Sequence, residues 1–348
     1  MSAANSAVWL LEAGGQFVVQ EAPMPSPGPG EVLIKNKAIA VNPMDWKIQV
    51  YGPHLPFPKQ YPFILGADVA GEIHEVGQDV TTFKKGDRVM GAANWFLSND
   101  IRDSGFQNYT ICKATVVAPL PDTTSFESGS VLPLALTTAA MGLYPAGRLE
   151  LPLPQATQPT PINKVILVWG GSSSTGSATI QLAVASGATV IATASARNHS
   201  FVQSLGAAKV LDYRKESIVQ DLIKAIQDTP GEFAGALDAI GEEDTVRRCA
   251  DVVKGLGSGG RVVTNLPREV KDIPAGVEVV GVVDAAHISD NKAVSEGIWG
   301  RFVPEALENG TLKPVPEPLL VGRGLEKIPE GVSLSQQGIS AKKIVVAL

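Results

Sequence analysis

In the second half of the chain, runs of hydrophobic residues alternate with segments in which hydrophobic residues have helical spacing. Val165 to Trp169 is an unbroken apolar run, which is typical of a strand buried on both faces of a parallel sheet. A second run, Ala188 to Ala194, follows at the distance expected of a strand–helix–strand unit. This order predicts a doubly wound parallel sheet. Further strands are expected at 209–211, 236–239, 261–265 and 277–283, with helices at 198–205, 218–226 and 244–253.

The first third has a different pattern, in which apolar and polar residues alternate over short segments. This alternation predicts half-buried strands, and the glycines within 63–76 are typical of a strand that bends into a small barrel. The stretch 51–62 contains four prolines and is expected to be an exposed loop. The expected strands cover 7–11, 17–20, 31–41, 63–76, 105–115 and 116–119. A turn at 84–89 is expected to lead into one more strand.

The remaining segments connect these two regions. Residues 125–144 have helical spacing and lead into the parallel sheet. The segment 149–161 is rich in proline and threonine, and we expect a surface insertion. Near the end, 299–309 predicts a helix, and 342–348 predicts a strand that returns to the first region.

Size and composition indicate a two-domain α/β protein. A chain of 348 residues, of which 44% are hydrophobic, can form two cores. We expect one domain from 1–125 and 290–348, and a second from 126–289. The net charge is −6 and no basic block occurs, which argues against a nucleic-acid partner.

Cysteine usage and the N-terminus indicate the compartment. Cys112 and Cys249 are the two cysteines, they lie far apart, and they lack metal-type spacing, which fits a reducing compartment. The first fifteen residues lack a basic region and a long apolar run, so we expect neither a secretory signal nor a membrane span. A cytoplasmic location is the corresponding expectation.

A glycine-rich turn follows the first strand of the parallel sheet and opens a helix. This order places free backbone N–H groups at a helix N-terminus, where a pyrophosphate can bind. Read as G-x-G-x-x-G, the turn has Gly171 first, Ser173 second and Gly176 third. Serine can replace the middle glycine if its φ stays negative. The alternative is an ordinary tight turn. The expected cofactor residues are Gly170, Gly171, Ser172, Ser173, Ser174, Thr175 and Gly176.

The end of the second strand indicates which dinucleotide is bound. NAD-preferring folds place an acidic residue there against the ribose diol, but 191–198 contains no Asp or Glu. Ser195 and Arg197 stand where a 2′-phosphate would lie, and arginine suits phosphate geometry. The segment therefore predicts NADP(H). A plain helix start, with Ser195 or Asn198 as N-cap, is compatible with this interpretation.

Several motifs together resemble the medium-chain dehydrogenase/reductase superfamily. Within it, the chain is most similar to the zinc-free fungal branch of ToxD-like and CipB-like oxidoreductases and trans-acting enoyl reductases. The resemblance covers nearly the whole chain and implies a GroES-like β-rich catalytic domain, built from both chain ends, plus a Rossmann domain that binds NADP(H). The motifs are NPMDWK (42–47), YPFILGADVAGEIHEVG (61–77), KKGDRV (84–89), LPLALTTAAMGLY (132–144), VILVWGGSSSTGSATIQLA (165–183) and LGAAKVLDYR (205–214).

The resemblance also indicates where a catalytic zinc would be bound in zinc-dependent relatives. Their cysteine and histidine–glutamate ligand positions correspond to Asn42 and to Ala67-Asp68 here. Zinc requires about three protein ligands with nitrogen or sulfur among them, so we expect no metal. The four-cysteine structural zinc lobe is also absent. His74 beside Glu75 lies in an alternating strand and is expected to be a surface or packing residue.

Without a metal, a substrate carbonyl must be polarised by side chains or backbone donors. Lys47 could hold an oxyanion or enolate, with Asp45 orienting it or capping the following turn. The resemblance places Thr138 near the nicotinamide and Tyr213 along the 2′-phosphate. The alternatives are a solvated lysine for Lys47, a helix threonine that bonds its own backbone for Thr138, and strand-end packing for Tyr213.

The sequence thus predicts an NADPH-dependent, zinc-independent reductase of activated C=C bonds. Hydride would reach the β-carbon of an enone or enoyl thioester, in fungal secondary metabolism according to the resemblance. The substrate would be a small molecule or a carrier-bound acyl group, with a polyketide synthase as candidate partner and a monomer or homodimer as the assembly. Two alternatives stay open: a quinone or enone detoxifying reductase, and a reused fold that binds cofactor but catalyses a non-redox step such as cyclisation.

Overall fold

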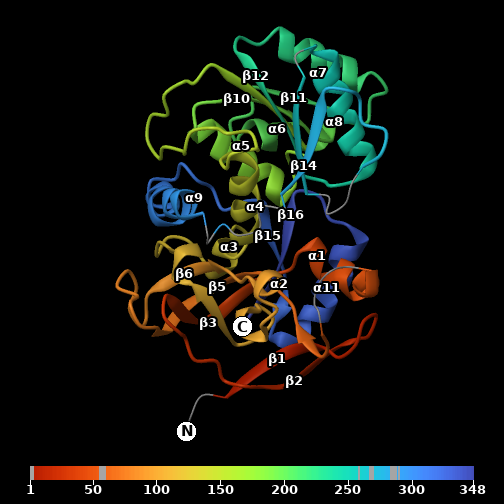
Figure 1. Cartoon of the computed structure of the whole chain (residues 1–348). Coiled ribbons are helices and arrows are strands. Elements are labelled where there is room, and N and C mark those ends of the chain that lie inside the picture. The colour runs from red at the N-terminus through yellow and green to blue at the C-terminus, as the bar shows by residue number, and fades with distance from the viewer. Residues whose placement is uncertain (1–3, 55–59, 258, 266–269, 283–287, 289–290) are drawn as a thin grey trace. The chain divides into compact units, whose positions relative to one another are not determined.

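A computed structural model describes residues 4–54, 60–257, 259–265, 270–282, 288 and 291–348. Contacts divide the chain into two units. The first contains Met1–Leu134 and Lys313–Leu348, and the second contains Ala135–Leu312. The first is rich in β-strands and the second contains a parallel sheet with helices, so the predicted α/β fold class is confirmed (Figure 1).

The first unit is built on a seven-stranded sheet and a three-stranded sheet. The larger has the order β15-β16-β3-β5-β6-β8, with β7 also paired to β3, and the smaller has the order β2-β1-β4. The strands are β1 (Asn5–Leu10), β2 (Phe17–Ala22), β3 (Glu31–Ala40), β4 (Phe63–Ile64), β5 (Asp68–Val76), β6 (Arg88–Ala92), β7 (Tyr109–Lys113), β8 (Val117–Pro119), β15 (Glu317–Arg323) and β16 (Lys342–Ala347).

The two ends of the chain meet in this unit, as expected. Strand β16 pairs antiparallel with β3, with Val345 opposite Ala40. In Figure 1 the blue C-terminal strands accordingly lie with the red and orange N-terminal strands. A close approach between β3 and β5 explains one of the predicted glycine kinks, because a Cβ on Gly71 would lie 2.1 Å from the Lys35 carbonyl oxygen.

A helix after β3 was not predicted. The pattern indicated that Asn42 to Lys47 ends a strand and that a loop begins at Tyr51, whereas the structure has α1 from Pro43 to Tyr51. Asn42 is the N-cap, proline occupies the first turn, and Asp45 at N3 completes a capping box. The short helix η1 (Gly52–His54) follows, and residues 55–59 of the expected proline-rich loop lie outside the described part.

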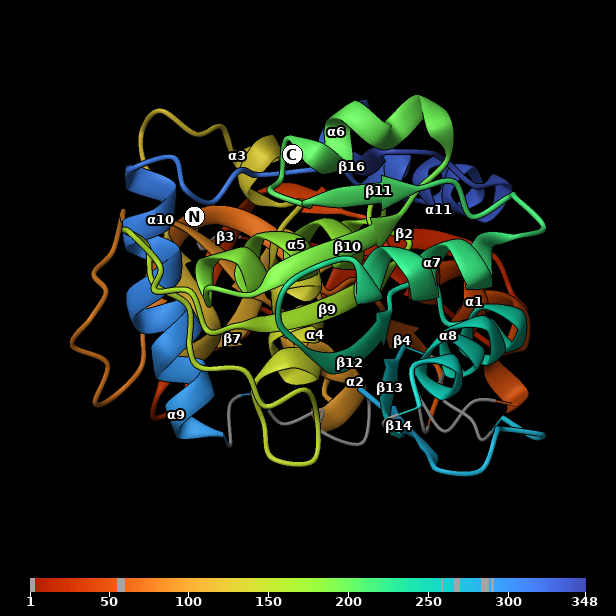
Figure 2. The same cartoon turned by 90° about the horizontal axis from the view of Figure 1, so that it is seen from above.

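The second unit contains a six-stranded, all-parallel sheet in the order β11-β10-β9-β12-β13-β14. Its strands are β9 (Lys164–Trp169), β10 (Thr189–Thr193), β11 (Lys209–Leu211), β12 (Glu232–Asp238), β13 (Gly260–Thr264) and β14 (Val277–Gly281). Figure 2 shows β11, β10, β9 and β12 side by side. The helices of this unit include α5 (Ser174–Ala185), α6 (His199–Gln203), α7 (Ile218–Gln227) and α8 (Glu243–Gly255).

Helices cover both faces of this sheet. Ala236 and Val262 share a core with α7 and α8. Their strand neighbours Leu237 and Val263 point the other way, toward Gly142 of α4 (Pro133–Leu143). The strands are therefore buried on both sides, which is why they appear in the sequence as unbroken apolar runs.

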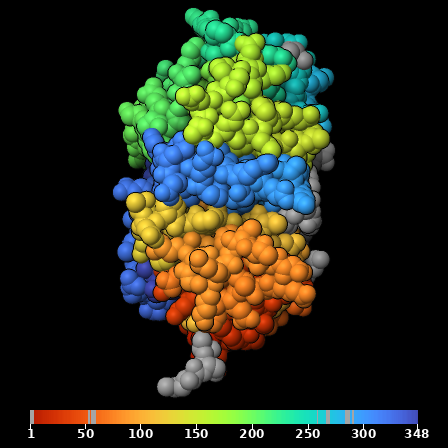
Figure 3. Space-filling view, turned by 90° about the vertical axis from the view of Figure 1, so that its left-hand side faces the viewer, coloured from red at the N-terminus to blue at the C-terminus, as the bar shows by residue number. Residues whose placement is uncertain are grey.

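The second unit extends further toward the C-terminus than expected. We expected the division at 289/290, whereas the contacts place it at 312/313. The helical segment α9 (Lys292–Ser295), η6 (Glu296–Phe302) and α10 (Val303–Glu308) packs on the insertion 149–161: Asn309 and Thr311 donate hydrogen bonds to the carbonyl of Ala156. In Figure 3 the yellow-green insertion and the blue helical segment are both visible at the surface. A hollow of about 330 Å³ lies between them.

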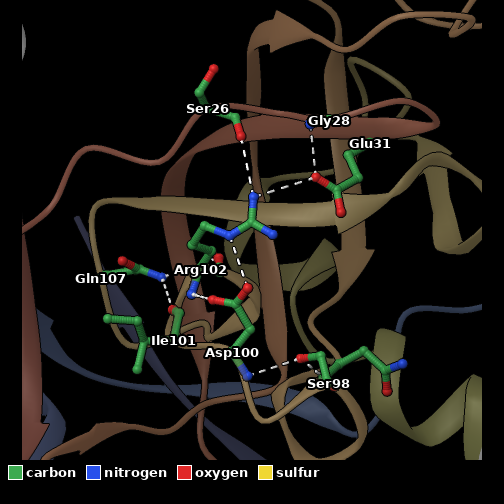
Figure 4. Close-up of polar contacts among 9 residues, drawn as sticks. Ser26, Gly28, Glu31, Ser98, Asp100, Ile101, Arg102 and Gln107 are labelled. Carbon is green, nitrogen blue, oxygen red and sulfur yellow. Dashed lines mark hydrogen bonds and ion pairs between the residues drawn. The ribbon is translucent and has the colours of Figure 1, made fainter.

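In the first unit, Arg102 joins the short helix η2 (Ile101–Asp103) to the chain around β3. Arg102 bonds the carboxylate of Asp100 at 2.9 Å and lies 3.7 Å from that of Glu31 (Figure 4). It also donates to the Ser26 carbonyl at 3.4 Å. These partly exposed contacts join the segment around 98–107 to the strand β3 and the chain before it.

None of the helices among the described residues is long and apolar enough to cross a bilayer.

Candidate functional site

The glycine-rich turn lies between β9 and α5, as predicted. Ser173 is the N-cap of α5 with φ −73°, the negative value that lets serine replace the middle glycine of the fingerprint. Its hydroxyl accepts a hydrogen bond from the Gly176 amide at 3.0 Å. Gly170 has φ +80°, a conformation that favours glycine. Ile240 packs beside this turn, because a Cβ on Gly170 would lie 2.5 Å from its side chain.

Three amides of the turn remain available for a ligand. Within the described residues, the N–H groups of Ser172, Ser174 and Thr175 have no internal hydrogen-bond partner, whereas the neighbouring turn amides are satisfied. Unpaired N–H groups in the first turn of a helix form an anion site because donors and the helix dipole act together. The geometry therefore fits a pyrophosphate at this place.

Gly176 is required by the close packing of α5 against the strand end. A Cβ at this position would lie 2.2 Å from the carbonyl oxygen of Gly170 and 2.9 Å from the Cα of Gly171. Both are backbone atoms, which cannot rotate away as a flexible side chain could. This is the role of the third fingerprint glycine.

Strand β10 supports the turn from the side. The hydroxyl of Thr193 accepts the Gly170 N–H at 3.0 Å, and its carbonyl accepts the Gly171 N–H at 2.8 Å. The sequence interpretation did not identify Thr193. Its residue type carries no motif, and its contact depends on the parallel pairing of β9 with β10.

The predicted phosphate-binding residues lie at the carboxyl ends of β10 and β11. Ser195 is largely buried, while Arg197 and Tyr213 are exposed. These strands are adjacent and parallel, with Thr193 opposite Leu211, so the segments that follow them meet at one edge of the sheet. The structure thus places the three residues on two neighbouring segments.

An acidic residue near this edge was missed by the sequence interpretation. Asp212 follows β11, and its carboxylate accepts the backbone N–H of Arg214 at 3.1 Å. Two side-chain N–H groups of Arg214 bind it at 2.9 and 2.7 Å and hold the pKa of this carboxyl well below its usual range. The carboxylate is therefore already paired. The sequence signal for this pair is the triplet Asp212-Tyr213-Arg214, in which an acid and an arginine stand two residues apart.

A second buried acid closes the loop after β12. Asp238 accepts hydrogen bonds from the amides of Ile240 and Gly241 and from the hydroxyls of Thr245 and Thr264. Burial holds the pKa of this carboxyl above its ordinary value, against the lowering effect of these donors. All its contacts are internal, so Asp238 shapes the loop beside the turn.

In the first unit, the positions that correspond to the zinc ligands of zinc-dependent relatives are occupied by residues of other types. Asn42 and Asp68 are buried and hydrogen-bonded to each other, and Ala67 contributes no ligand atom. The ammonium of Lys343 lies 3.0 Å from the Asp68 carboxylate and donates a short hydrogen bond to the Asn42 side-chain oxygen. A cation cannot coordinate a metal, and thiolate and imidazole are missing, so these residues do not fit zinc.

Asp45 caps α1 rather than orienting Lys47. Its carboxylate accepts the Asn42 N–H at 2.7 Å and the Gly66 N–H at 3.3 Å. Burial raises the pKa of the Asp45 carboxyl to about 7, although the Asn42 bond and the Lys343 charge act in the opposite direction. Of the two alternatives for Asp45, the structure therefore shows the cap.

Lys47 lies on the exposed side of α1. Its ammonium is 5.8 Å from the ring centroid of Trp46, and no carboxylate partner occurs in the described part of the chain. Thr138 lies half-buried on α4 in the second unit. The catalytic roles of both residues remain predictions.

His74 packs edge-on against Tyr109, at 5.1 Å between ring centroids, so the expected packing role is confirmed.

The polar partner of Asp68 was not found from the sequence. Lys343 lies 301 residues after Asn42 and stands beside another lysine in a short strand. Nothing local distinguishes a buried lysine from an exposed one at such a position.

A hollow of about 490 Å³ at the amino ends of β9, β12, β13 and β14 was also not expected, and it lies at the edge of the sheet opposite the glycine-rich turn.

Comparison with known protein families agrees with this architecture. The family described as "Alcohol dehydrogenase GroES-like domain" matches residues 28–122, and "Zinc-binding dehydrogenase" matches residues 174–265. In this chain the residues at the ligand positions are those given above.

Relatives and solved structures extend the match to almost the whole chain. "Dehydrogenase orsE" of Emericella nidulans is 39% identical over 99% of this chain and 100% of its own length. "Trans-enoyl reductase himH" of Aspergillus japonicus is 42% identical over 91% of this chain and 90% of its own. An alcohol dehydrogenase superfamily protein from Novosphingobium aromaticivorans has a similar crystal structure, with a TM-score of 0.78, 25% identity and 99% coverage of both chains. The chain therefore belongs to the medium-chain dehydrogenase/reductase superfamily, together with fungal dehydrogenases and trans-enoyl reductases.

Proposed function

We propose that this protein is an NADPH-dependent, zinc-independent reductase that transfers hydride to the β-carbon of an enoyl thioester or enone. The observation that supports it best is the combination of an open amide cradle at Ser172, Ser174 and Thr175 with a non-metal polar cluster at the ligand positions of zinc-dependent relatives. The first indicates a dinucleotide and the second indicates carbonyl activation by hydrogen-bond donors.

The cofactor would bind to the second unit. The free amides of the turn would hold the pyrophosphate, while Ser195 and Arg197 would hold the 2′-phosphate, with Tyr213 beside it. Asp212 does not provide a ribose-binding carboxylate in this arrangement, because the side chain and the backbone N–H of Arg214 already bind it. These features favour NADPH over NADH.

We expect Arg197→Ala to weaken NADPH binding by about tenfold or more and to leave NADH binding nearly unchanged, because a charge-assisted phosphate contact contributes roughly 1.5–3 kcal/mol. Fluorescence titration with both cofactors measures this. Arg247→Ala, which removes another exposed arginine of the same unit, is the matched control and should change neither affinity. Equal affinities of the unmodified protein for NADPH and NADH would contradict the assignment.

The chemistry of the donor set supports zinc independence. An amide, a carboxylate and an ammonium replace thiolate and imidazole, and the described residues contain no group of three or more His, Cys, Asp or Glu that could hold a metal.

We therefore expect the purified, dialysed protein to contain well below one zinc per chain, and its reductase activity to survive a strong chelator. Inductively coupled plasma mass spectrometry provides the measurement, with a zinc-dependent alcohol dehydrogenase treated in parallel as the positive control. A stoichiometric zinc content, with activity lost on chelation, would rule out this part of the proposal.

The chemistry would be conjugate reduction. When bound, NADPH supplies the hydride. The developing negative charge on the carbonyl oxygen requires donors, and the ammonium of Lys47, which has no carboxylate partner among the described residues, would supply one. A conjugated acceptor suits this arrangement because an enolate forms more readily under hydrogen-bond activation than an alkoxide does from a simple ketone.

Relatives support the choice of substrate and partner. Three of the similar fungal proteins are described as trans-enoyl reductases, and the one that covers the whole chain is 32% identical. We propose by analogy that an enoyl thioester on a carrier is the substrate and that a polyketide synthase is the partner that presents it. A panel of enoyl thioesters, enones, quinones and simple ketones, with NADPH oxidation as the readout, tests this order. Turnover of simple ketones alone would contradict it.

A further inference from the structure

A buried lysine stands at the centre of the polar cluster in the first unit. Lys343 on β16 is 4% exposed, and it is the only lysine or arginine among the described residues that is this well buried. The preceding residue, Lys342, points to solvent and pairs with Glu317 on the neighbouring strand. A buried ammonium is strongly unfavourable unless it is paired and hydrogen-bonded, so the contacts of Lys343 must compensate for its burial.

Those contacts join distant segments of the chain. The Asp68 carboxylate binds Lys343 at 3.0 Å and the side-chain amide of Asn42 at 2.8 Å through one oxygen. Its other oxygen accepts the backbone N–H of Leu134 at 2.6 Å, within the first turn of α4. Asn42 in turn is the N-cap of α1 and accepts the Lys343 hydrogen bond. One carboxylate thus holds β16, the start of α1 and the start of α4 together.

Lys343 supplies the positive charge that faces the buried carboxyl groups of this cluster. Asp68 and Asp45 are both fully buried, and Lys343 is the cation that faces them. If an uncharged side chain replaced the lysine, Asp68 would keep the hydrogen bonds from Asn42 and from the Leu134 N–H but would have no counter-ion. Removal of one partner of a buried pair is far more disruptive than replacement of both.

We propose that Lys343 is a positioning residue of the catalytic unit: its ammonium is a resident cation that fixes the α1 N-cap and the first turn of α4 through Asp68 and Asn42. It holds segments together around the positions at which zinc-dependent relatives bind their metal. Helix α1 carries Lys47, so displacement of its N-cap would misplace the proposed carbonyl donor. The link to catalysis rests on the proposed function, whereas the structural role of the ion pair does not.

Four variants and one control test this inference. Lys343→Met keeps the length of the side chain and removes the charge, and Lys343→Arg keeps the charge. Asp68→Asn removes the partner charge, and the double variant Lys343→Met/Asp68→Asn removes both. Lys342→Met removes the neighbouring exposed lysine. Thermal unfolding, NADPH affinity by fluorescence, and kcat with a reactive enone are measured for each.

We expect Lys343→Met to lower the unfolding temperature by roughly 6–15 °C, and Lys342→Met to change it by no more than about 1 °C. The double variant should unfold at a higher temperature than Lys343→Met alone, because it contains no unpaired buried charge. Lys343→Arg should restore part of the stability and of kcat. In Lys343→Met, kcat should fall by about tenfold to hundredfold, while NADPH affinity should stay within about twofold of the parent.

Three results would overturn the inference. An unfolding temperature of Lys343→Met within about 2 °C of the parent would show that the ion pair is not structural. A double variant as unstable as the sum of the two single changes would exclude charge pairing as the cause. An unchanged kcat in a destabilised Lys343→Met would exclude the positioning role. If Lys343→Met does not fold, the comparison of Asp68→Asn with the double variant decides the pairing and Lys343→Arg decides the positioning role.

Failure of the proposed function itself would look different. A parent protein that binds NADPH but reduces no conjugated acceptor would refute that function, and the unfolding temperatures would still support or overturn the role of the ion pair.

Discussion

Gly176→Ala should weaken NADPH binding by about tenfold to hundredfold, because one methyl group displaces the turn that holds the pyrophosphate. The new Cβ would lie 2.2 Å from the carbonyl oxygen of Gly170, so the start of α5 must move away from the end of β9. That movement shifts the free amides of Ser174 and Thr175, which must point at the ligand together. Fluorescence titration with NADPH measures the effect.

The matched control for this change is Gly300→Ala, in the helical segment η6 of the same unit. A Cβ on Gly300 would have no neighbour within 4 Å, so this variant should bind NADPH like the parent. Equal binding by Gly176→Ala and Gly300→Ala would mean that the glycine-rich turn does not hold the cofactor.

Lys47→Met should lower the rate of hydride transfer by about 10²–10³-fold and leave NADPH affinity unchanged. The ammonium of Lys47 lies over Trp46 at the exposed side of α1, without a carboxylate partner in the described part of the chain, so its charge is available to a substrate oxygen. A lost oxyanion donor affects the transition state more than the ground state. Single-turnover NADPH oxidation with a reactive enone isolates this step.

The competing interpretation makes Lys47 an ordinary solvated lysine, and it predicts no change in rate. Lys85→Met, which removes another exposed lysine of the same unit, shows the size of any nonspecific charge effect. Lys47→Arg should retain part of the rate if a cationic donor is what matters. A parent-like rate in Lys47→Met would remove this residue from the mechanism.

The parallel sheet could be predicted because its signals are local. Strands such as β9 are buried on both faces, so they appear as unbroken apolar runs. The turn that follows β9 is marked in the sequence by Gly170, Gly171 and Gly176. Helix α1 was missed although Asn42, a proline and Asp45 stand at capping positions, because the proline-rich stretch that follows suggested irregular structure. The capping box was the stronger signal.

The polar cluster of the first unit could be predicted only in part. Comparison of motifs showed that Asn42 and Asp68 replace metal ligands, since each lies within a recognisable stretch. Their partner Lys343 comes from the other end of the chain, and its burial depends on the pairing of β16 with β3. Contacts of this kind are fixed by tertiary structure. For the same reason, the sequence leaves both an orienting role and a capping role open for Asp45, whose backbone partners are Asn42 and Gly66.

The most direct test of the central claim is the fate of a labelled hydride. The protein is incubated with NADPH that carries deuterium at the transferable C4 position and with an α,β-unsaturated acyl thioester, and the product is analysed by NMR and mass spectrometry. We predict one deuterium at the β-carbon and a solvent-derived proton at the α-carbon. Deuterium at the carbonyl carbon, or no transfer to any conjugated acceptor despite tight NADPH binding, would contradict the account.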